Sequence, residues 1–264
     1  MLRAHVFLAC LLLAASGCST APASDGSDPQ YTSTLNIYFN PMYSGYDGVH
    51  TYRVPATIDN GNGAAPVAGA HWEASDPSMV DIAPDPTDPT GVGVLLTTKK
   101  AGTVTITATT KDAIGKALLT ITAYTPDQWQ LGQTRYTAGD MTTIGMQLHG
   151  SRSKYVQCTS CHGTMVAIEH TPEQTGGFSD EEMKGIILHG TLPPQDLMVD
   201  IHGGAAQFKA FHQWMVASDD EANGLVAYLR SLPPKAQGMI DFGGHGHHHG
   251  DGGWSPPDGG MAGW

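Results

Sequence analysis

The sequence is poor in cysteine and in charge. It holds 4 cysteines among 264 residues, and charged residues make up 14% of the chain. So few cysteines exclude a fold built on a disulfide framework. Acidic residues outnumber basic ones by 25 to 13, which gives a formal charge of -12 at pH 7. An acidic surface repels phosphate backbones, so we expect no nucleic acid partner.

Long apolar runs are scarce too, and only the start of the chain carries one. Arg3 precedes the apolar run 6–15, which is too short to span a bilayer and is typical of a signal peptide. The following Ala15-Ser-Gly-Cys18 resembles a bacterial lipobox. The resemblance implies that residues 1–17 are removed and that Cys18 is lipidated, with 18–30 as a flexible tether. The alternative is an ordinary signal peptide with a coincidental cysteine.

Residues 31–124 predict an all-β domain. Runs rich in β-branched and aromatic residues recur at 34–39, 51–54, 92–98, 102–109 and 117–124. Val104 and Ile106 alternate with threonines, so one face of that strand is buried and the other is wet. Turn signals such as Asn60-Gly61 separate the runs. The spacing favours an antiparallel sandwich.

This region resembles the bacterial Ig-like domains of group 2. The residues that carry the resemblance are His71-Trp72-Glu-Ala-Ser75-Asp76-Pro-Ser-Met-Val80 and Lys100-Ala-Gly102-Thr-Val-Thr-Ile-Thr-Ala-Thr109. They match the family's tryptophan strand, Ser-Asp turn and Ala-Gly-Thr strand. The resemblance implies a spacer or an adhesive module.

The chain changes character after this domain. Residues 125–136 have no clear period and are interpreted as a linker, and 137–235 predict a helical domain. Ser179 and Glu182 stand at capping-box spacing ahead of an apolar run, and Ser218 and Glu221 repeat that spacing. Apolar residues after Ser218 follow helical spacing until Pro233-Pro234 ends the helix. The Gly-rich tail 236–264 predicts disorder, although its histidines (245 and 247–249) could bind Zn, Cu or Ni weakly.

The chemical signal of the sequence is Cys158-Thr-Ser-Cys161-His162. This spacing is that of covalent haem attachment, in which both sulfurs form thioethers and the adjacent histidine reaches the iron. A structural zinc site needs four ligands, and the sequence has no second cysteine pair. A thioredoxin-like pair expects a strand-helix setting, which is not predicted here. A local disulfide is the third alternative.

The second domain resembles class I cytochromes c over nearly its whole length. The residues that carry the resemblance are Lys154-Tyr-Val-Gln-Cys158-Thr-Ser-Cys161-His162-Gly163 and Ser218-Asp-Asp-Glu-Ala-Asn-Gly-Leu-Val-Ala-Tyr-Leu-Arg-Ser-Leu-Pro-Pro234. The resemblance implies one covalent haem c with His162 as proximal ligand. It also implies that the terminal helix crosses an earlier helix at a glycine and an aromatic residue. We place that earlier helix within 139–150, where Met141-Thr-Thr-Ile carries unfavourable β-branched residues.

The sixth iron ligand has competing candidates. The family takes it from the loop before the terminal helix, usually from a Met-Pro pair, and this chain has no Met-Pro. The spacing of short-loop members places His212 at the ligand position, with Met215 as the alternative and Met198 next. His189 and His202 are weaker candidates. Methionine would raise the potential relative to a second imidazole.

The sequence therefore predicts a multidomain chain, with an all-β Ig-like sandwich followed by an all-α class I cytochrome c domain. We expect the second domain to fold on its own, without the sandwich. The expected function is electron transfer in the cell envelope, on the periplasmic side or at the outer-membrane surface. Redox proteins are the expected partners, and the lipid is the only membrane anchor. We expect no enzyme activity. The alternatives are a haem subunit of an envelope oxidoreductase and a surface adhesion or haem-sensing module.

The lipobox generates the first prediction. Because acyl chains supply the membrane affinity, Cys18→Ala should release the protein into the soluble fraction. Fractionation followed by a detergent-free wash measures this. A variant that stays with the membranes through the wash would contradict the anchor.

Overall fold

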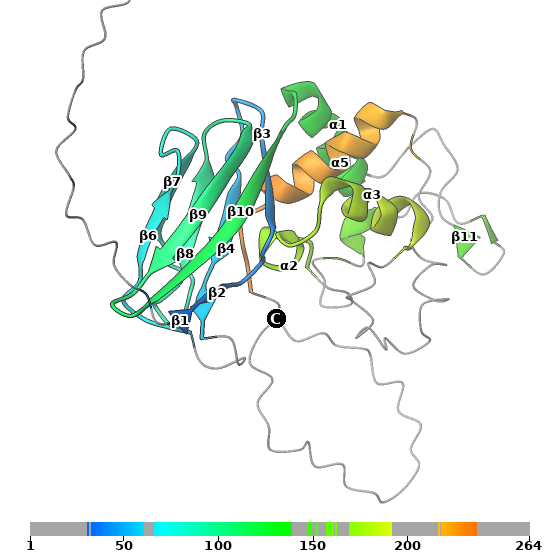
Figure 1. Ribbon diagram of the computed structural model, residues 1–264. Coiled ribbons are helices and arrows are strands. Elements are labelled where there is room, and N and C mark those ends of the chain that lie inside the picture. Colours follow the sequence, from blue (N-terminus) through cyan, green and yellow to red (C-terminus); the bar gives the residue numbers. More distant parts are fainter. Residues whose placement is uncertain are drawn as a thin grey trace, which may run out of the picture. The chain divides into compact units, whose positions relative to one another are not determined.

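The computed structural model describes residues 31, 33–60, 66–138, 147–148, 151–152, 157–160, 162, 169–191, 216 and 218–236. Within this part of the chain, a sheet-rich N-terminal region is followed by helices (Figure 1). The predicted order of strands and then helices is confirmed. No helix among the described residues is long and apolar enough to cross a membrane.

Two main sheets make up the sheet-rich region. In the first, β10 pairs with β9 on one side and with β1 and β3 on the other, and β9 also pairs with β6. In the second, β8 pairs with both β4 and β7, while the short β2 and β5 pair with each other. The bounds are β1 (Ser33–Thr34), β2 (Asn36–Ile37), β3 (Met42–Tyr46), β4 (Arg53–Ala56), β5 (Ile58–Asp59), β6 (His71–Ala74), β7 (Val80–Pro84), β8 (Val94–Thr98), β9 (Gly102–Thr109) and β10 (Ala113–Ala123).

Alternation of side chains builds the sandwich core. Val104, Ile106 and Ala108 of β9 are buried, and the residues between them are less covered. Leu96 of β8 and Leu119 of β10 belong to the same cluster, both with no exposed surface. A one-residue slip of either strand would turn these side chains to the solvent, so the apolar pattern fixes the register.

The predicted strand runs do not cover β3, β5 or β7. β3 contains Ser44 and Gly45, and β7 contains Asp81 and ends on Pro84, all residue types of low strand propensity. β3 and β1 also run parallel to β10, whereas the other strand pairs are antiparallel. The sandwich is therefore mixed at this edge rather than wholly antiparallel.

The interpretation of residues 125–136 as a linker is wrong for most of that segment, because helix α1 (Pro126–Ala138) occupies it. Its buried residues are Gly132, Arg135 and Tyr136, so its inner face carries no apolar stripe that periodicity could detect. The helix nevertheless has a start signal. Gln128 N–H donates to Thr125 Oγ1 at 3.1 Å, and Thr125 N–H donates to Gln128 Oε1 at 3.0 Å, which is a capping box.

Two of the other helices begin where the sequence predicts. In α3 (Asp180–His189), Ser179 and Glu182 form both bonds of the capping box. In α5 (Asp219–Ser231), Ser218 Oγ accepts the Glu221 N–H at 3.2 Å. The helix ends one residue before Leu232 and the two prolines. The remaining described elements are α2 (Pro172–Thr175), the 3-10 turn η1 (Cys158–Ser160), β11 (Gln147–Leu148) and β12 (Ser151–Arg152).

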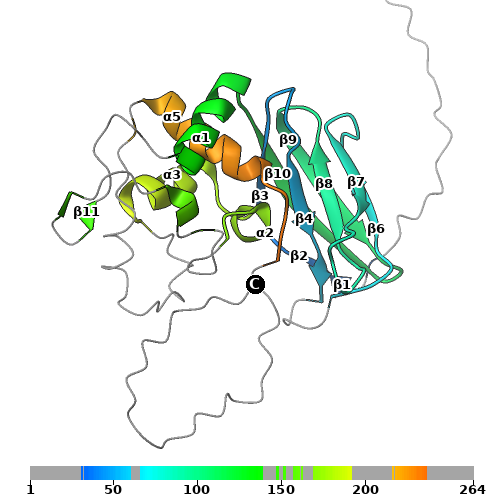
Figure 2. The ribbon, with the colours of Figure 1, turned by 180° about the vertical axis from the view of Figure 1, so that it is seen from behind.

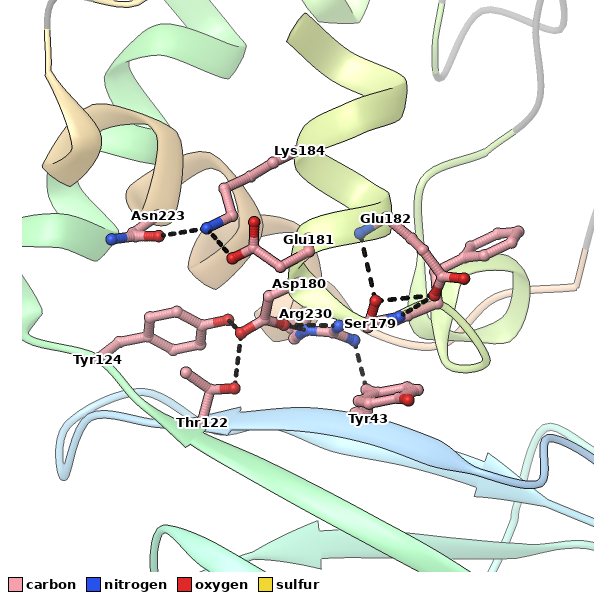
Figure 3. Close-up of polar contacts among 11 residues, drawn as sticks. Tyr43, Thr122, Tyr124, Ser179, Asp180, Glu181, Glu182, Lys184, Asn223 and Arg230 are labelled. Carbon is pink, nitrogen blue, oxygen red and sulfur yellow. Dashed lines mark hydrogen bonds and ion pairs between the residues drawn. The ribbon is translucent and has the colours of Figure 1, made fainter. Parts of the chain in front are cut away.

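A buried ion pair joins the helices to the sandwich (Figure 3). Arg230 of α5 is 2% exposed, and its Nε donates to Asp180 Oδ1 of α3 at 2.8 Å. Its Nη1 donates to the Tyr43 carbonyl of β3 at 3.1 Å, and its Nη2 donates to the Phe178 carbonyl at 2.6 Å. We call this the Arg230 network.

Strand β10 completes the Arg230 network from the sandwich side. Thr122 Oγ1 and Tyr124 OH donate to Asp180 Oδ2 at 2.6 and 2.8 Å. Burial, with the nearby Asp180 charge, raises the pKa of Tyr124, so this phenol stays a donor. Tyr52 and Tyr124 also share an apolar cluster with Leu225 and Leu229 of α5. These contacts do not fit the expectation that the helical part folds without the sandwich. Removing the sandwich would expose the apolar cluster and take away the Tyr43 carbonyl that accepts a hydrogen bond from Arg230.

The Arg230 network generates the second prediction. Asp180→Ala leaves a buried guanidinium without its carboxylate and should lower the free energy of unfolding by about 3–5 kcal/mol. Asp81→Ala is the matched control, because the Lys99–Asp81 pair has side chains that are 37% and 67% exposed. Exposed pairs contribute about 0–1 kcal/mol. Denaturant titration of the full chain measures both, and equal effects would contradict the role given to the network.

Candidate cofactor site

Helices α1 and α5 lie across each other (Figure 2). Two glycines, Gly132 and Gly224, stand at the point of closest approach. A Cβ atom on Gly132 would overlap the carbonyl oxygen of Gly224, and one on Gly224 would overlap the carbonyl oxygen of Gln128. The two backbones therefore approach more closely than any other residue pair permits. A crossing of α5 with an earlier helix at a glycine is present, and that helix is α1. The segment 139–150, where we expect it from the sequence, lies mostly outside the described residues.

Aromatic and polar contacts flank the crossing. The rings of Tyr136 and Tyr228 lie 5.3 Å apart, and those of Trp129 and Tyr228 lie 5.4 Å apart. Trp129 Nε1 donates to Ser231 Oγ at 2.6 Å, which ties α1 to the last turn of α5. Arg135, 5% exposed, pairs with Glu221 of α5, with Nε and Oε1 3.3 Å apart. The crossing is thus fixed on both sides.

The turn that begins at Cys158 lies against this crossing. His162 N–H donates to the Cys158 carbonyl at 2.9 Å, a bond between residues four apart that closes one helical turn. Cys158 is half-buried and packs against the cluster that holds Tyr136, Leu225 and Leu229. Cys158 therefore packs over apolar side chains, and a backbone hydrogen bond ties His162 to it.

An open pocket of about 430 Å³ lies beside His162. Thr159 and His162 of the motif, Tyr136 of α1 and the segment 232–235 after α5 line it, together with Glu169 and Thr171. Leu232, Pro233 and Pro234 make this wall mainly apolar.

Hydrogen bonds hold that wall in place. Lys235 N–H donates to Thr171 Oγ1 at 3.3 Å, and Gln174 Nε2 donates to the Lys235 carbonyl at 3.0 Å. Lys235 Nζ also pairs with Glu169 Oε1 at 2.8 Å. The chain that leaves α5 is therefore pinned to the segment that follows the motif.

Burial keeps the phenol of Tyr136, beside the motif, in its protonated form. It raises the pKa of Tyr136, and the nearby Cys158 and Tyr228 add to the shift, so this phenol stays protonated at physiological pH. The ring of His170 stacks on that of His162, with centroids 3.5 Å apart. The proximal-ligand candidate is thus oriented by a neighbouring ring.

Two members of the predicted haem-attachment set, Cys158 and His162, are described, and both lie beside the α1–α5 crossing or its pocket. Their thiol and imidazole are of the types that would form a thioether bond and an iron bond with haem c. Among the described residues, no group of three or more His, Cys, Asp or Glu side chains could hold a metal ion. A closed structural zinc site needs four such ligands.

Several predicted site residues lie outside the described part of the chain. They are Cys161, the second attachment cysteine, the sixth-ligand candidates Met198, His202, His212 and Met215, and the lipidation candidate Cys18. Their roles stay predictions. His189, the weaker candidate, is the last residue of α3.

The sequence patterns missed the residues that frame the site. Gly132 and Tyr136 lie in the segment taken for a linker, and only the Thr125-Pro126-Asp127-Gln128 start signal could have revealed their helix. Thr171 and Lys235 are 64 residues apart, and no local pattern marks their contact.

No protein-family model matches the chain, and no curated protein is similar to it in sequence. Three solved structures resemble its sheet-rich N-terminal part. A complex of titin and obscurin-like 1 Ig domains shares 13% identity, with a TM-score of 0.25, over 35% of this chain and 94% of that one. A domain named IG27 shares 16% identity, with a TM-score of 0.21, over 34% and 94% of the two chains. The PKD domain of human KIAA0319 shares 16% identity, with a TM-score of 0.20, over 38% and 90%.

The helix crossing generates the third prediction. Gly224→Ala forces a methyl group into the backbone of α1 and should destabilise the protein by about 1–3 kcal/mol, even though alanine favours a helix. Gly185→Ala on α3 is the matched control, because the nearest atom to its Cβ is 4.0 Å away. That variant should gain about 0.5–1 kcal/mol. Denaturation midpoints measure the difference, and a Gly224→Ala variant as stable as Gly185→Ala would refute the close crossing.

Proposed function

We propose that this chain is a monohaem c-type cytochrome that carries single electrons in a bacterial cell envelope. Haem c would be bound through Cys158 and Cys161, with His162 as proximal ligand. The observation that carries this proposal is the closed turn from Cys158 to His162, held against the α1–α5 crossing and open to a pocket. The crossing at Gly132 and Gly224, with Tyr228 beside it, supports the same assignment.

The residues of the site have distinct tasks. Cys158 and Cys161 would anchor the group by thioether bonds, and the imidazole of His162 would supply one axial ligand. Leu232, Pro233 and Pro234 give the pocket an apolar wall, and the polarity of its surroundings is one of the factors that would set the haem potential. When bound, haem c supplies a one-electron redox couple. If the protein supplied two ligands to the iron, the group would exchange an electron without any bond being made or broken.

The sixth ligand would come from the loop before α5. We propose His212, with Met215 as the alternative. Two histidine ligands would favour a lower potential than histidine with methionine.

The sandwich would serve as a spacer between the haem part and the membrane. We propose that it is an Ig-like domain of group 2, tethered through lipidated Cys18 on the periplasmic side or at the outer-membrane surface. Its contacts with α3 and α5 through the Arg230 network would make it a stiff extension of the helical part rather than a hinged one. Redox proteins of the envelope would be the partners.

Carbon monoxide tests the proposal. A six-coordinate carrier has no open iron position, so the spectrum of the reduced wild-type protein should not change when carbon monoxide is added. A potentiometric titration should show one single-electron transition. His212→Ala should create a carbon monoxide-sensitive spectrum, and Met215→Ala, the matched variant, should not. A wild-type spectrum that shifts with carbon monoxide would instead favour a haem enzyme subunit.

A further inference from the structure

An unbroken line of aromatic rings runs from His162 to the sandwich. We call it the aromatic chain. The centroid distances of its successive pairs are 3.5 Å for His162–His170, 5.9 Å for His170–Tyr136, 5.3 Å for Tyr136–Tyr228, 5.4 Å for Tyr228–Trp129 and 3.6 Å for Trp129–His50. Each of these distances places neighbouring rings in direct contact or nearly so.

The far end of the aromatic chain reaches the protein surface. His50 lies in the segment between β3 and β4, and its side chain is 26% exposed. Its neighbour Val49 is 68% exposed. His50 Nδ1 lies 2.6 Å from Asp47 Oδ2, a contact that fixes the imidazole in its stack on Trp129. The aromatic chain thus connects the pocket to a solvent-facing point on the sandwich.

The inner rings are held rigidly and stay neutral. Trp129 is fixed by its bond to Ser231, and Tyr136 is 6% exposed. Burial raises the pKa of Tyr136 and of Tyr228, so neither phenol loses its proton at physiological pH.

We propose that the aromatic chain is the path by which an electron passes between the haem at His162 and a redox partner protein that approaches at His50 and Val49. The inference rests on the proposed function, and it adds an exit point and a task for the sandwich. Tunnelling weakens less through rings in contact than across gaps filled by water or by saturated side chains. One electron leaves the donor and one arrives at the acceptor, while the bridging rings keep their electrons and protons.

Core packing alone would also bring these rings together, so the test must separate coupling from packing. The experiment uses the full chain with haem bound and the substitution Val49→Cys, whose thiol carries a ruthenium polypyridyl photoreductant. Flash photolysis of this label then gives the rate at which the haem is reduced. Trp129→Leu breaks the line of rings and Trp129→Phe keeps it. We expect the first variant to slow reduction by about an order of magnitude and the second to leave it nearly unchanged. A label at Leu118→Cys, a 45% exposed site on β10 outside the aromatic chain, should report the same rate in all variants.

A second pair of variants avoids the buried tryptophan in case Trp129→Leu does not fold. His50→Leu should slow reduction from the Val49 label and His50→Phe should preserve it. Equal rates in the leucine and phenylalanine variants, with spectrum and potential unaltered, would overturn the aromatic path and leave the cytochrome proposal standing. A chain without covalent haem would instead overturn the proposed function itself.

Discussion

The buried Arg230 guanidinium is the group on which the arrangement of this molecule depends. A charge that is 2% exposed must be compensated by hydrogen bonds and an opposite charge. Its partners come from separate parts of the chain: Asp180 from α3, the Phe178 carbonyl just before α3, and the Tyr43 carbonyl from β3. The sandwich and the helices must therefore be assembled together before this charge is satisfied.

The position of α5 then governs the candidate site. Once Arg230 fixes α5 against β3, the paired glycines fix α1 across it, and the cluster beneath them receives Cys158. The segment after α5 is pinned to Thr171 and forms a wall of the pocket beside His162. The contact between β3 and α5 therefore helps to set the position of the motif. The sandwich thus has a structural role in the site.

The parts of the fold that local pattern governs could be predicted from the sequence. The bounds of β9 follow from the alternation of Val104 and Ile106 with threonines, and the starts of α3 and α5 follow from their caps. The cysteine–histidine motif is likewise local, since five adjacent residues carry it. The sequence patterns missed helix α1, because its buried face carries Gly132 and Arg135. These residues do not form the apolar stripe that marks a helix packed on a hydrophobic core. The Arg230 network joins residues up to 187 positions apart, and no periodicity encodes such a contact.

The most direct test of the central claim is whether haem stays on the polypeptide after it is denatured. The wild-type protein, produced with the machinery that attaches haem c, should keep its haem through acid–acetone extraction, and the denatured chain should show a thioether-type haem spectrum. Thioether bonds at Cys158 and Cys161 would survive conditions that strip a haem held only by His162. A wild-type chain that emerges from the extraction without haem would contradict the account.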